Sequence, residues 1–529
     1  MYDVIIRGGQ VIDGSGAAGY AGDVAIEGDR IAALGRVEGV ARSEIDASGL
    51  VVGPGFIDLH SHSDFNFFID PMADSKIRQG VTVELTGNCG LSFCAPLTDE
   101  SRVPLDTRVG WYPTDWTPTW TSFGGYLDAL EQNGSTLNLA TQVGHGTVRH
   151  AVLGMATRAP DTGELKRMRS LVEEALEAGA LGFSTGLSMT PGNFSLTEEV
   201  MELAAAAAER DRLYSTHMRD SSDESSGLFV AIHEAMEIGR RTGVRVQMSH
   251  LKCGGSMRGR AEEILETIER GRKEGIDLAA DQYPYTAGSG HMSGNTLPRW
   301  IQEGGREKAL ERLADADLRA EARVGIDRAI ARAGGPERFM IANFPPDISY
   351  EGKDVAALAD QLGVEPAETL VLLYERYDAQ LILSGMTEPD VRAIAKADFT
   401  AVASDGDSLR TEGPLSIGSP HPRSYGTFPR FFAQMARGSD GVTIENAVRK
   451  MTALPAERLG LSARGRLAPG YLADVVVFDA DSIEDRADFS SPHQYSDGVH
   501  HVLVNGVAVV AGGVSTGATP GRVLRDEAH

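Results

Sequence analysis

GPGFIDLHSHSD, residues 53–64, is the stretch that decides the fold. A short apolar run in it ends at His60-Ser61-His62. If residues 55–62 form a strand, its period of two places His60 and His62 on the same face. Neutral imidazoles side by side at the mouth of a buried strand suit a divalent metal. The alternative is that two histidines occur at this spacing by chance and lie in the core. The rest of the chain has to decide between a metal site and this alternative.

Working outward, the middle of the chain alternates between strand-like and helix-like segments. The strand-like segments are 51–59, 81–88, 136–144, 180–187, 213–218, 244–250, 277–283 and 399–406. Helix-like stretches with apolar residues three to four apart include 164–179, 197–211, 228–243 and 260–275. Eight strands alternating with helices predict a (β/α)8 barrel. An open doubly wound sheet is second, because no Gly-rich phosphate fingerprint follows the first strand.

The two ends of the chain differ from the middle. Residues 2–50 and the far end are β-branched and rich in turn signals such as GG, DG and GSG, which predicts a small β-sandwich built from both termini. The expected domains are therefore a β-sandwich from 1–54 and 451–529, and a barrel over 55–450. Charged, helix-prone sequence at 286–350 predicts a subdomain inserted within the barrel.

A further irregular stretch, residues 97–121, contains three of the four tryptophans in a Pro- and Thr-rich context. A loop of this length is usually functional, so a lid or pocket wall competes with a plain surface loop.

Composition narrows the partners. The chain has 529 residues and a formal net charge of −25, which argues against nucleic acid or an anionic membrane as the main partner and leaves a small molecule. Its three cysteines fit a reducing cytoplasm rather than a disulfide framework. The first residues lack the features of a signal peptide. The sequence has no uninterrupted run of 18 apolar residues, so no membrane span is expected. We expect a cytoplasmic protein, and the sequence does not indicate its oligomeric state.

Polar residues gather where the expected strands end, which is where barrels carry their chemistry. These residues are His60, His62, Asn88, Cys89, His217, His250, Lys252, Asp281, Tyr283 and Asp405. Ligand-type residues at five strand ends make a chance explanation unconvincing. We expect a divalent metal, with zinc as the first choice for imidazole, thiolate and carboxylate ligands.

The roles within this set follow from chemistry. The strand at 180–187 has no lysine that could bridge two metals, so Cys89 is the candidate bridge; a small buried hydrophobe is its alternative. Asp405 is placed to take a proton from a metal-activated water and pass it to a leaving amine, although Asp-Gly is also a common turn. His145 and His421 are further candidates, of which His145 is expected to support the site; His291 carries no clear signal but lies close enough to the strand at 277–283 to reach a pocket.

These residues sit in motifs that resemble the amidohydrolase superfamily, and more closely its N-acyl-D-amino-acid deacylase (D-aminoacylase) family. The motifs run almost from end to end: GFIDLHSHSD, TVELTGNCGLS, QVGHGTVR, GALGFSTGLSMTPG, YSTHMRD, VQMSHLK, DQYPYTAGS, ASDG, HPRSYGTFPR and GYLADVVVFD. The Asn-Cys-Gly, Ser-His-Leu-Lys and His-Pro-Arg elements are the specific ones.

The resemblance implies a tight zinc held by Cys89, His217 and His250. It implies a second, weaker or empty metal site formed by His60, His62, Cys89 and Asp405, with Asp405 as general base and then acid. It also implies that Lys252, Tyr283 and Arg423 bind the substrate α-carboxylate.

The expected activity is therefore zinc-dependent hydrolysis of N-acyl-D-amino acids. Relatives that prefer acidic side chains resemble one another in an arginine soon after YPY; here TAGSGHMSGN has none before Arg299, so neutral or apolar side chains are expected. Members of the family commonly have an aromatic residue shortly before the Pro191-Gly192 pair, where this sequence has Met189. An amidohydrolase acting on a different amide or a cyclic amide, as hydantoinases do, is the alternative. A catalytically silent metal-binding protein is a further one.

Overall fold

Eight parallel strands form the centre of the protein in this computed structural model, which describes residues 1–220, 227–437 and 441–525. They are β6 (Phe56–Asp58), β7 (Val81–Thr86), β8 (Asn138–Gly144), β9 (Gly182–Gly186), β10 (Leu213–His217), β11 (Arg245–Met248), β12 (Leu278–Gln282) and β16 (Thr400–Val402). Each pairs with its neighbour in the order β16-β12-β11-β10-β9-β8-β7-β6. The predicted barrel is confirmed.

The barrel closes at the edge where β6 meets β16. Ser61 and Gly406 form a parallel bridge there. The backbone N–H of Asp405 donates to the His60 carbonyl at 2.8 Å, and that of His62 donates to the Gly406 carbonyl at 3.1 Å. Closure thus places the two ends of the barrel sequence, the His-Ser-His stretch and Asp405, side by side.

Amphipathic helices cover the barrel. They include α4 (Phe123–Asn133), α5 (His145–Leu153), α6 (Thr162–Ala178), α7 (Thr197–Ala208), α8 (Leu228–Thr242), α9 (Ala261–Lys273), α16 (Glu388–Lys396), α17 (Arg423–Phe431), α18 (Ile444–Met451) and α19 (Ala453–Leu459). In α9, for example, Ile264 and Ile268 are fully buried, while acidic residues fill the first turn and basic residues the last, which complements the helix dipole. Among the described residues, no helix is both long and apolar enough to cross a membrane.

Both ends of the chain build one nine-stranded sheet. Its strands are β1 (Tyr2–Val11), β2 (Tyr20–Glu27), β3 (Arg30–Gly35), β4 (Ala41–Asp46), β5 (Val51–Pro54), β17 (Val475–Phe478), β18 (Val499–Val504), β19 (Val507–Ala511) and β20 (Val514–Ser515). The join is β5 against β17, where Val52 lies opposite Val477. The predicted 51–59 strand is in fact two, because β5 belongs to this sheet and β6 to the barrel.

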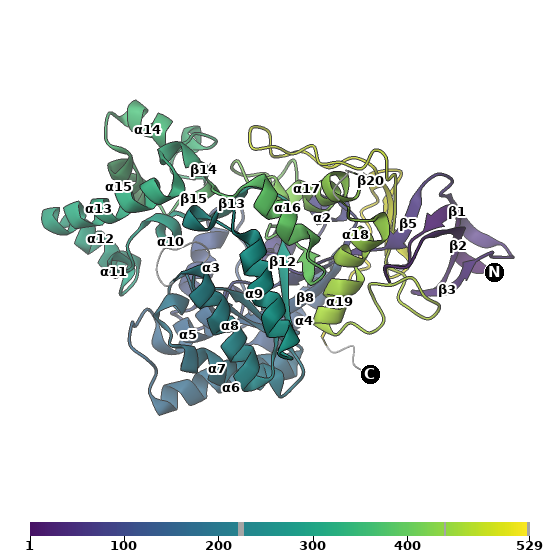
Figure 1. The fold of residues 1–529 in the computed structure, drawn as a ribbon, viewed down its shortest axis with the longest axis horizontal. Helices are drawn as coiled ribbons and strands as arrows, with labels where there is room; N and C mark the ends of the chain where they lie inside the picture. Colours follow the sequence, from purple (N-terminus) through teal and green to yellow (C-terminus); the bar gives the residue numbers. More distant parts are fainter. Residues whose placement is uncertain (221–226, 438–440, 526–529) are drawn as a thin grey trace.

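A subdomain lies between β12 and β16. It contains β13 (Ala287–His291), α10 (Met292–Thr296), α11 (Arg299–Gln302), α12 (Arg306–Ala314), α13 (Ala316–Ala333), β14 (Phe339–Asn343), α14 (Val355–Leu362), α15 (Pro366–Arg376) and β15 (Gln380–Ser384). The three strands form their own sheet, and the helices enclose a separate apolar core. These elements continue past residue 350 because β15 is the central strand of the sheet. Figure 1 shows the subdomain and the nine-stranded sheet at opposite ends of the barrel.

Candidate active site

Six predicted metal-site residues meet at the mouth of the barrel. They come from the segments after β6, β7, β11 and β16 and from the end of β10: His60, His62, Cys89, His217, His250 and Asp405. Four of them, His60, Cys89, His250 and Asp405, each offer a ligand atom, and these atoms all lie within 4.8 Å of one another. The arrangement of the strands in the barrel thus brings together side chains that are far apart in sequence.

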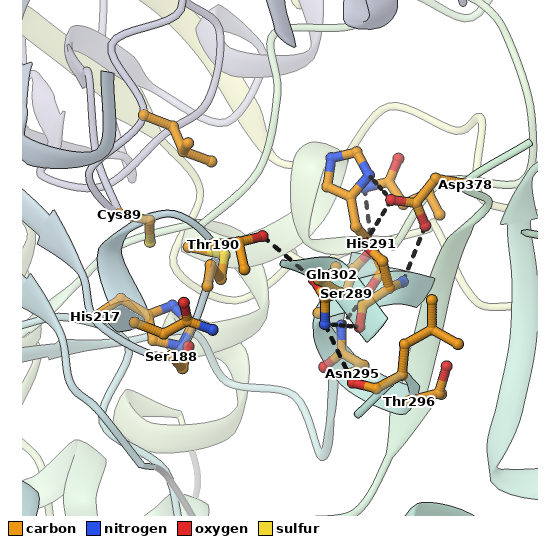
Figure 2. Close-up of a pocket in the computed structure, with 18 of the residues that line it drawn as sticks. Cys89, Ser188, Thr190, His217, Ser289, His291, Asn295, Thr296, Gln302 and Asp378 are labelled. Carbon is orange, nitrogen blue, oxygen red and sulfur yellow. Dashed lines mark hydrogen bonds and ion pairs between the residues drawn. The ribbon is translucent and has the colours of Figure 1, made fainter. Parts of the chain in front are cut away.

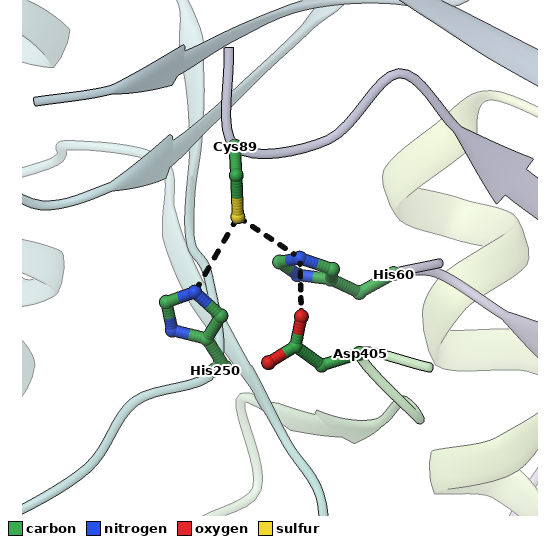
Figure 3. Close-up of side chains that lie close together, drawn as sticks. All are labelled: His60, Cys89, His250 and Asp405. Carbon is green, nitrogen blue, oxygen red and sulfur yellow. Dashed lines mark hydrogen bonds and ion pairs between the residues drawn. The ribbon is translucent and has the colours of Figure 1, made fainter. Parts of the chain in front are cut away.

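In the four-residue cluster the Cys89 sulfur contacts both His60 and His250, and His60 also contacts Asp405 (Figure 3). Cys89 Sγ lies 3.3 Å from His60 Nε2 and 3.5 Å from His250 Nε2. His60 Nε2 is also 3.4 Å from Asp405 Oδ1. The Cys89 sulfur therefore contacts two imidazoles that follow β6 and β11, strands that are not neighbours in the barrel.

The other two histidines adjoin this cluster. His62 Nε2 is 3.0 Å from Asp405 Oδ1. His217 Nδ1 is 2.9 Å from His250 Nε2, so these two rings face each other through nitrogen atoms. Two ring nitrogens this close compete for one proton, unless a cation is held between them and their neighbours.

The electrostatics of the cluster favour an anionic sulfur and an anionic carboxylate. Burial by itself would raise the pKa of the Cys89 thiol, but His60 and His250 outweigh it and hold this pKa well below its ordinary value. Burial would likewise raise the pKa of Asp405, but the Arg423 guanidinium beside it keeps that pKa well below its usual range. Burial, followed by Lys252 and His217, lowers the pKa of His250 to about 3. A thiolate, a carboxylate and a neutral imidazole are the states in which these groups bind metals.

A cationic group lies beside the cluster. Arg423 Nη1 is 2.7 Å from Asp405 Oδ2, and its guanidinium carbon is 4.8 Å from the centre of the Tyr283 ring. Lys252 Nζ is 6.0 Å from the same ring centre on the pocket side of β11. The Tyr283 hydroxyl is buried and has no hydrogen-bond partner. Two cations and an unpartnered hydroxyl are a suitable arrangement for a carboxylate.

The backbone of β13 leaves room at this point. A Cβ atom added to Gly288 would lie 3.1 Å from the Tyr283 hydroxyl and 3.9 Å from Lys252 Nζ. The absence of a side chain at Gly288 therefore keeps open the space in front of both polar groups.

One large cavity of about 1570 Å³ lies between the barrel mouth and the inserted subdomain, and it is lined by His62, Cys89, His217, His250, Lys252, Gly288, Asp405 and Arg423 among others. Figure 2 shows Cys89 and His217 on one side, and residues of β13 and α10 on the other. A hydrogen bond between Thr190 and Gln302, 3.2 Å long, joins the loop after β9 to α11. The subdomain thus forms a wall of the pocket rather than a distant appendage.

The segment 97–121 forms another part of the wall. It contains α3 (Arg102–Val109), whose Arg108 pairs with Asp407 at 3.1 Å, two residues beyond Asp405. Trp111 packs against His291 with ring centres 5.3 Å apart, so this segment also contacts the subdomain. Both Arg108 and His291 line the cavity.

Two other histidines singled out in the sequence, His145 and His421, have well-defined surroundings. His145 is fully buried, with Nε2 2.8 Å from Glu199 Oε1. His421 Nε2 donates to the Ala287 carbonyl at 2.9 Å, and its Nδ1 accepts from the Arg423 backbone N–H at 3.0 Å. His421 therefore fixes the start of the helix that carries Arg423.

Sequence reasoning missed one buried network beneath the cluster. Lys76 Nζ lies 2.7 Å from Asp58 Oδ2 and 3.4 Å from Glu84 Oε1, all three fully buried. Asp58 also accepts from the Ser404 backbone N–H at 2.9 Å, which ties β6 to the strand that carries Asp405. A lysine in the short helix α2 (Asp74–Ile77) gives no sequence signal that it is buried in an ion pair. Asp58 and Glu84 do give a signal, because they are acidic residues inside apolar strands.

Comparisons with known proteins identify a family and relatives that match almost the whole chain. A family model described as "Amidohydrolase family" matches residues 43–510. The chain is 36% identical over 535 residues to a D-aminoacylase of Alcaligenes xylosoxydans xylosoxydans, with 99% of this chain and 97% of the relative covered. It is also 36% identical over 529 residues to an N-acyl-D-glutamate deacylase of the same organism, with the same coverage of 99% and 97%.

A solved structure is similar over the whole chain. It is an N-acyl-D-glutamate deacylase from Bordetella bronchiseptica, complexed with zinc and a phosphonate inhibitor described as a mimic of the tetrahedral intermediate. Its TM-score is 0.82 at 33% sequence identity, and the match covers 99% of this chain and 100% of that one.

Proposed function

The chain belongs to the amidohydrolase family, and we propose that it hydrolyses the linear amide bond of N-acyl-D-amino acids to a carboxylate and a D-amino acid. The observation that carries this proposal is Tyr283, whose hydroxyl is buried without a hydrogen-bond partner and whose ring has both Lys252 and Arg423 beside it. The relatives named D-aminoacylase and N-acyl-D-glutamate deacylase, matched along almost their entire length, support the D configuration.

The residues present fit a metal, and zinc is our proposal for it. A buried thiol with a strongly lowered pKa, two imidazoles and a carboxylate form a donor set that zinc accepts, and their atoms lie close enough to share one ion. We assign Cys89, His217 and His250 to a tight site, and His60, His62, Cys89 and Asp405 to a second, weaker one. When bound there, the metal would polarise the scissile carbonyl and lower the pKa of an attacking water.

Asp405 is the group that moves the proton. Its carboxylate is ionised in the free protein because Arg423 lies 2.7 Å from Oδ2, so Oδ1 is available as a proton acceptor. His62, 3.0 Å from Oδ1, fixes the direction of that oxygen. We propose that Oδ1 accepts a proton from the attacking water and then donates it to the departing amine nitrogen.

Lys252, Tyr283 and Arg423 position the substrate in this proposal. The Tyr283 hydroxyl donates to one carboxylate oxygen, Lys252 provides a point charge, and the guanidinium of Arg423 can face both the substrate and Asp405. Because Arg423 forms an ion pair with Asp405, the group that anchors the substrate and the group that transfers the proton are in direct contact. This arrangement holds the amide carbonyl at a fixed distance from the cluster.

We further propose that the substrate side chain is neutral or apolar. One relative is named for D-glutamate and the other for no particular amino acid, and both are equally identical to this chain, so the proposal rests on the cavity wall itself. From Ala287 to Pro298 the sequence is AGSGHMSGNTLP, with His291 as its only titratable side chain. No lysine or arginine lies within this segment of the cavity wall to pair with an acidic side chain, although Arg108 and Arg299 line the same cavity elsewhere.

The test is amine release from paired N-acetyl-D- and N-acetyl-L-amino acids, covering methionine, leucine, phenylalanine and glutamate, with zinc supplied. Release restricted to the D series, and faster for the neutral side chains than for glutamate, is the expected result. A five-membered cyclic imide is included as a control for ring-opening activity. Release from the L series, or turnover of the imide alone, would overturn the proposal.

A further inference from the structure

Asp281, at the end of β12, contacts two separate elements of the cluster although it is not itself one of the four grouped donors. Its Oδ1 lies 3.2 Å from His60 Nδ1 and accepts from the backbone N–H of His250 at 2.7 Å. Its Oδ2 accepts from Gln247 Nε2 at 3.0 Å. The carboxylate is 1% exposed, so these three donors replace its water shell.

The contact with His60 selects one form of the ring. A carboxylate oxygen accepts hydrogen bonds, so the nitrogen that faces it carries the proton. When a metal cation replaces the proton on Nε2, the atom that points at Cys89 and Asp405, the remaining proton of His60 stays on Nδ1, facing Asp281. A carboxylate behind an imidazole both fixes this form and makes the ring a stronger ligand.

The contact with His250 acts on the backbone instead. His250 has a φ of 35°, in the left-handed region that non-glycine residues seldom adopt. The Asp281 oxygen holds its backbone N–H in that conformation, which turns the imidazole toward Cys89 and His217. Without an acceptor, this buried N–H would be unsatisfied and the strained conformation would lose its support.

We propose that Asp281 is a positioning residue that sets metal affinity by holding His60 from β6 and His250 from β11 with the same carboxylate oxygen. One atom thus connects ligands that we assigned to the tight and the weak metal sites. The proposal rests on the metal centre of the proposed function and does not depend on which amide is cleaved.

The test compares zinc affinity, measured on chelator-stripped full-length protein by competition with a chromophoric chelator. Asp281→Ala removes the acceptor and is expected to lower zinc affinity about 10- to 100-fold. Asp281→Asn keeps an amide oxygen that can face the same two donors after the Gln247 amide turns over, so it should restore part of this loss. Gln247→Met is the matched control, since it removes a hydrogen bond from the same carboxylate without touching a ligand; its affinity should stay within about threefold of the wild type.

A spectroscopic measurement separates positioning from general destabilisation. With Co²⁺ in place of zinc, Asp281→Ala should change the visible absorption bands, while Gln247→Met should keep the wild-type spectrum. Unchanged affinity and spectrum in Asp281→Ala, or an equal loss in Gln247→Met, would overturn the proposal.

If Asp281→Ala does not fold, zinc-loaded wild-type protein labelled with ¹⁵N-histidine decides. The proposal requires His60 to carry its proton on Nδ1; a proton on Nε2 refutes it. Failure of D-selective hydrolysis would leave both results unaffected, so the two proposals can fail separately.

Discussion

Replacing Gly288 by alanine should impair the anchoring of the substrate carboxylate without disturbing the fold. Gly288 lies in β13, and its φ is outside the left-handed region, so alanine can adopt the same backbone conformation. The added methyl group would lie 3.1 Å from the Tyr283 hydroxyl and 3.9 Å from Lys252 Nζ. It therefore fills the space in which we place one carboxylate oxygen.

The magnitude follows from the hydrogen bond that is lost. A hydrogen bond to a charged group contributes roughly 1.5–3 kcal/mol. Since about 1.4 kcal/mol corresponds to a factor of ten, kcat/KM should fall about 10- to 150-fold. Because the carboxylate is bound equally in the ground state and the transition state, most of this loss should appear in KM.

The assay is the initial rate of amine release from the best N-acetyl-D-amino acid. Gly290→Ala is the control, two residues along the same strand, where the new methyl group meets only the Asn295 side-chain amide at 2.9 Å. Its KM should stay within about threefold of the wild type, because a flexible side chain can move aside. The matching substrate control is an N-acetyl-D-amino acid amide, which has no carboxylate and should be turned over slowly and equally by both proteins. A wild-type KM in Gly288→Ala, or an equal rise in Gly290→Ala, would refute the placement of the carboxylate.

Three further outcomes follow from the structure. Asp405→Asn should lower kcat for amide hydrolysis by about 10²- to 10⁴-fold because the amide cannot accept the proton; a normal rate would show that another group does so. Lys76→Met leaves two buried carboxylates, Asp58 and Glu84, without their cation, and should lower the free energy of unfolding by about 3–5 kcal/mol in urea titrations; an unchanged midpoint would count against this. Burial lowers the pKa of Lys450 to about 8 from its ordinary value of 10.5. Between pH 8 and 10.5 the unfolded chain binds more protons than the folded one, so this residue makes the free energy of unfolding rise with pH. In urea titrations across this range, the free energy of unfolding of Lys450→Met should lack that contribution.

The parts of the fold that sequence predicted well are those with a local cause. Each barrel strand is a short apolar run between turn signals, and each covering helix has its own three-to-four period. The division of 51–59 could not be predicted in this way, because β5 and β6 are equally apolar and differ only in their partners. The division occurs at Gly55, where an added Cβ would lie 2.3 Å from the Thr82 side chain of the neighbouring strand.

In the candidate site, too, some features could be predicted from the sequence and others could not. His60, Cys89, His250 and Asp405 were found because each follows its own strand, and barrel geometry then brings strand ends together. Contacts between these residues and their supports are non-local and leave no pattern. Arg423 against Asp405, Asp281 against His60 and Lys76 against Asp58 are examples, each joining different elements of the barrel.

The place of a residue directly after a strand predicted the site residues but not where their side chains point, and backbone strain explains why. Among the described residues, six non-glycine positions have positive φ, and three of them are Cys89, His250 and Asp405, with φ of 54°, 35° and 52°. Such conformations cost of order 1–3 kcal/mol each and persist only where the surroundings enforce them. Here the strand ends turn sharply, so that three side chains from three strands point to one place. The sequence identifies where each strand stops, but the turn that aims the side chain is set by contacts such as Asp281 to His250.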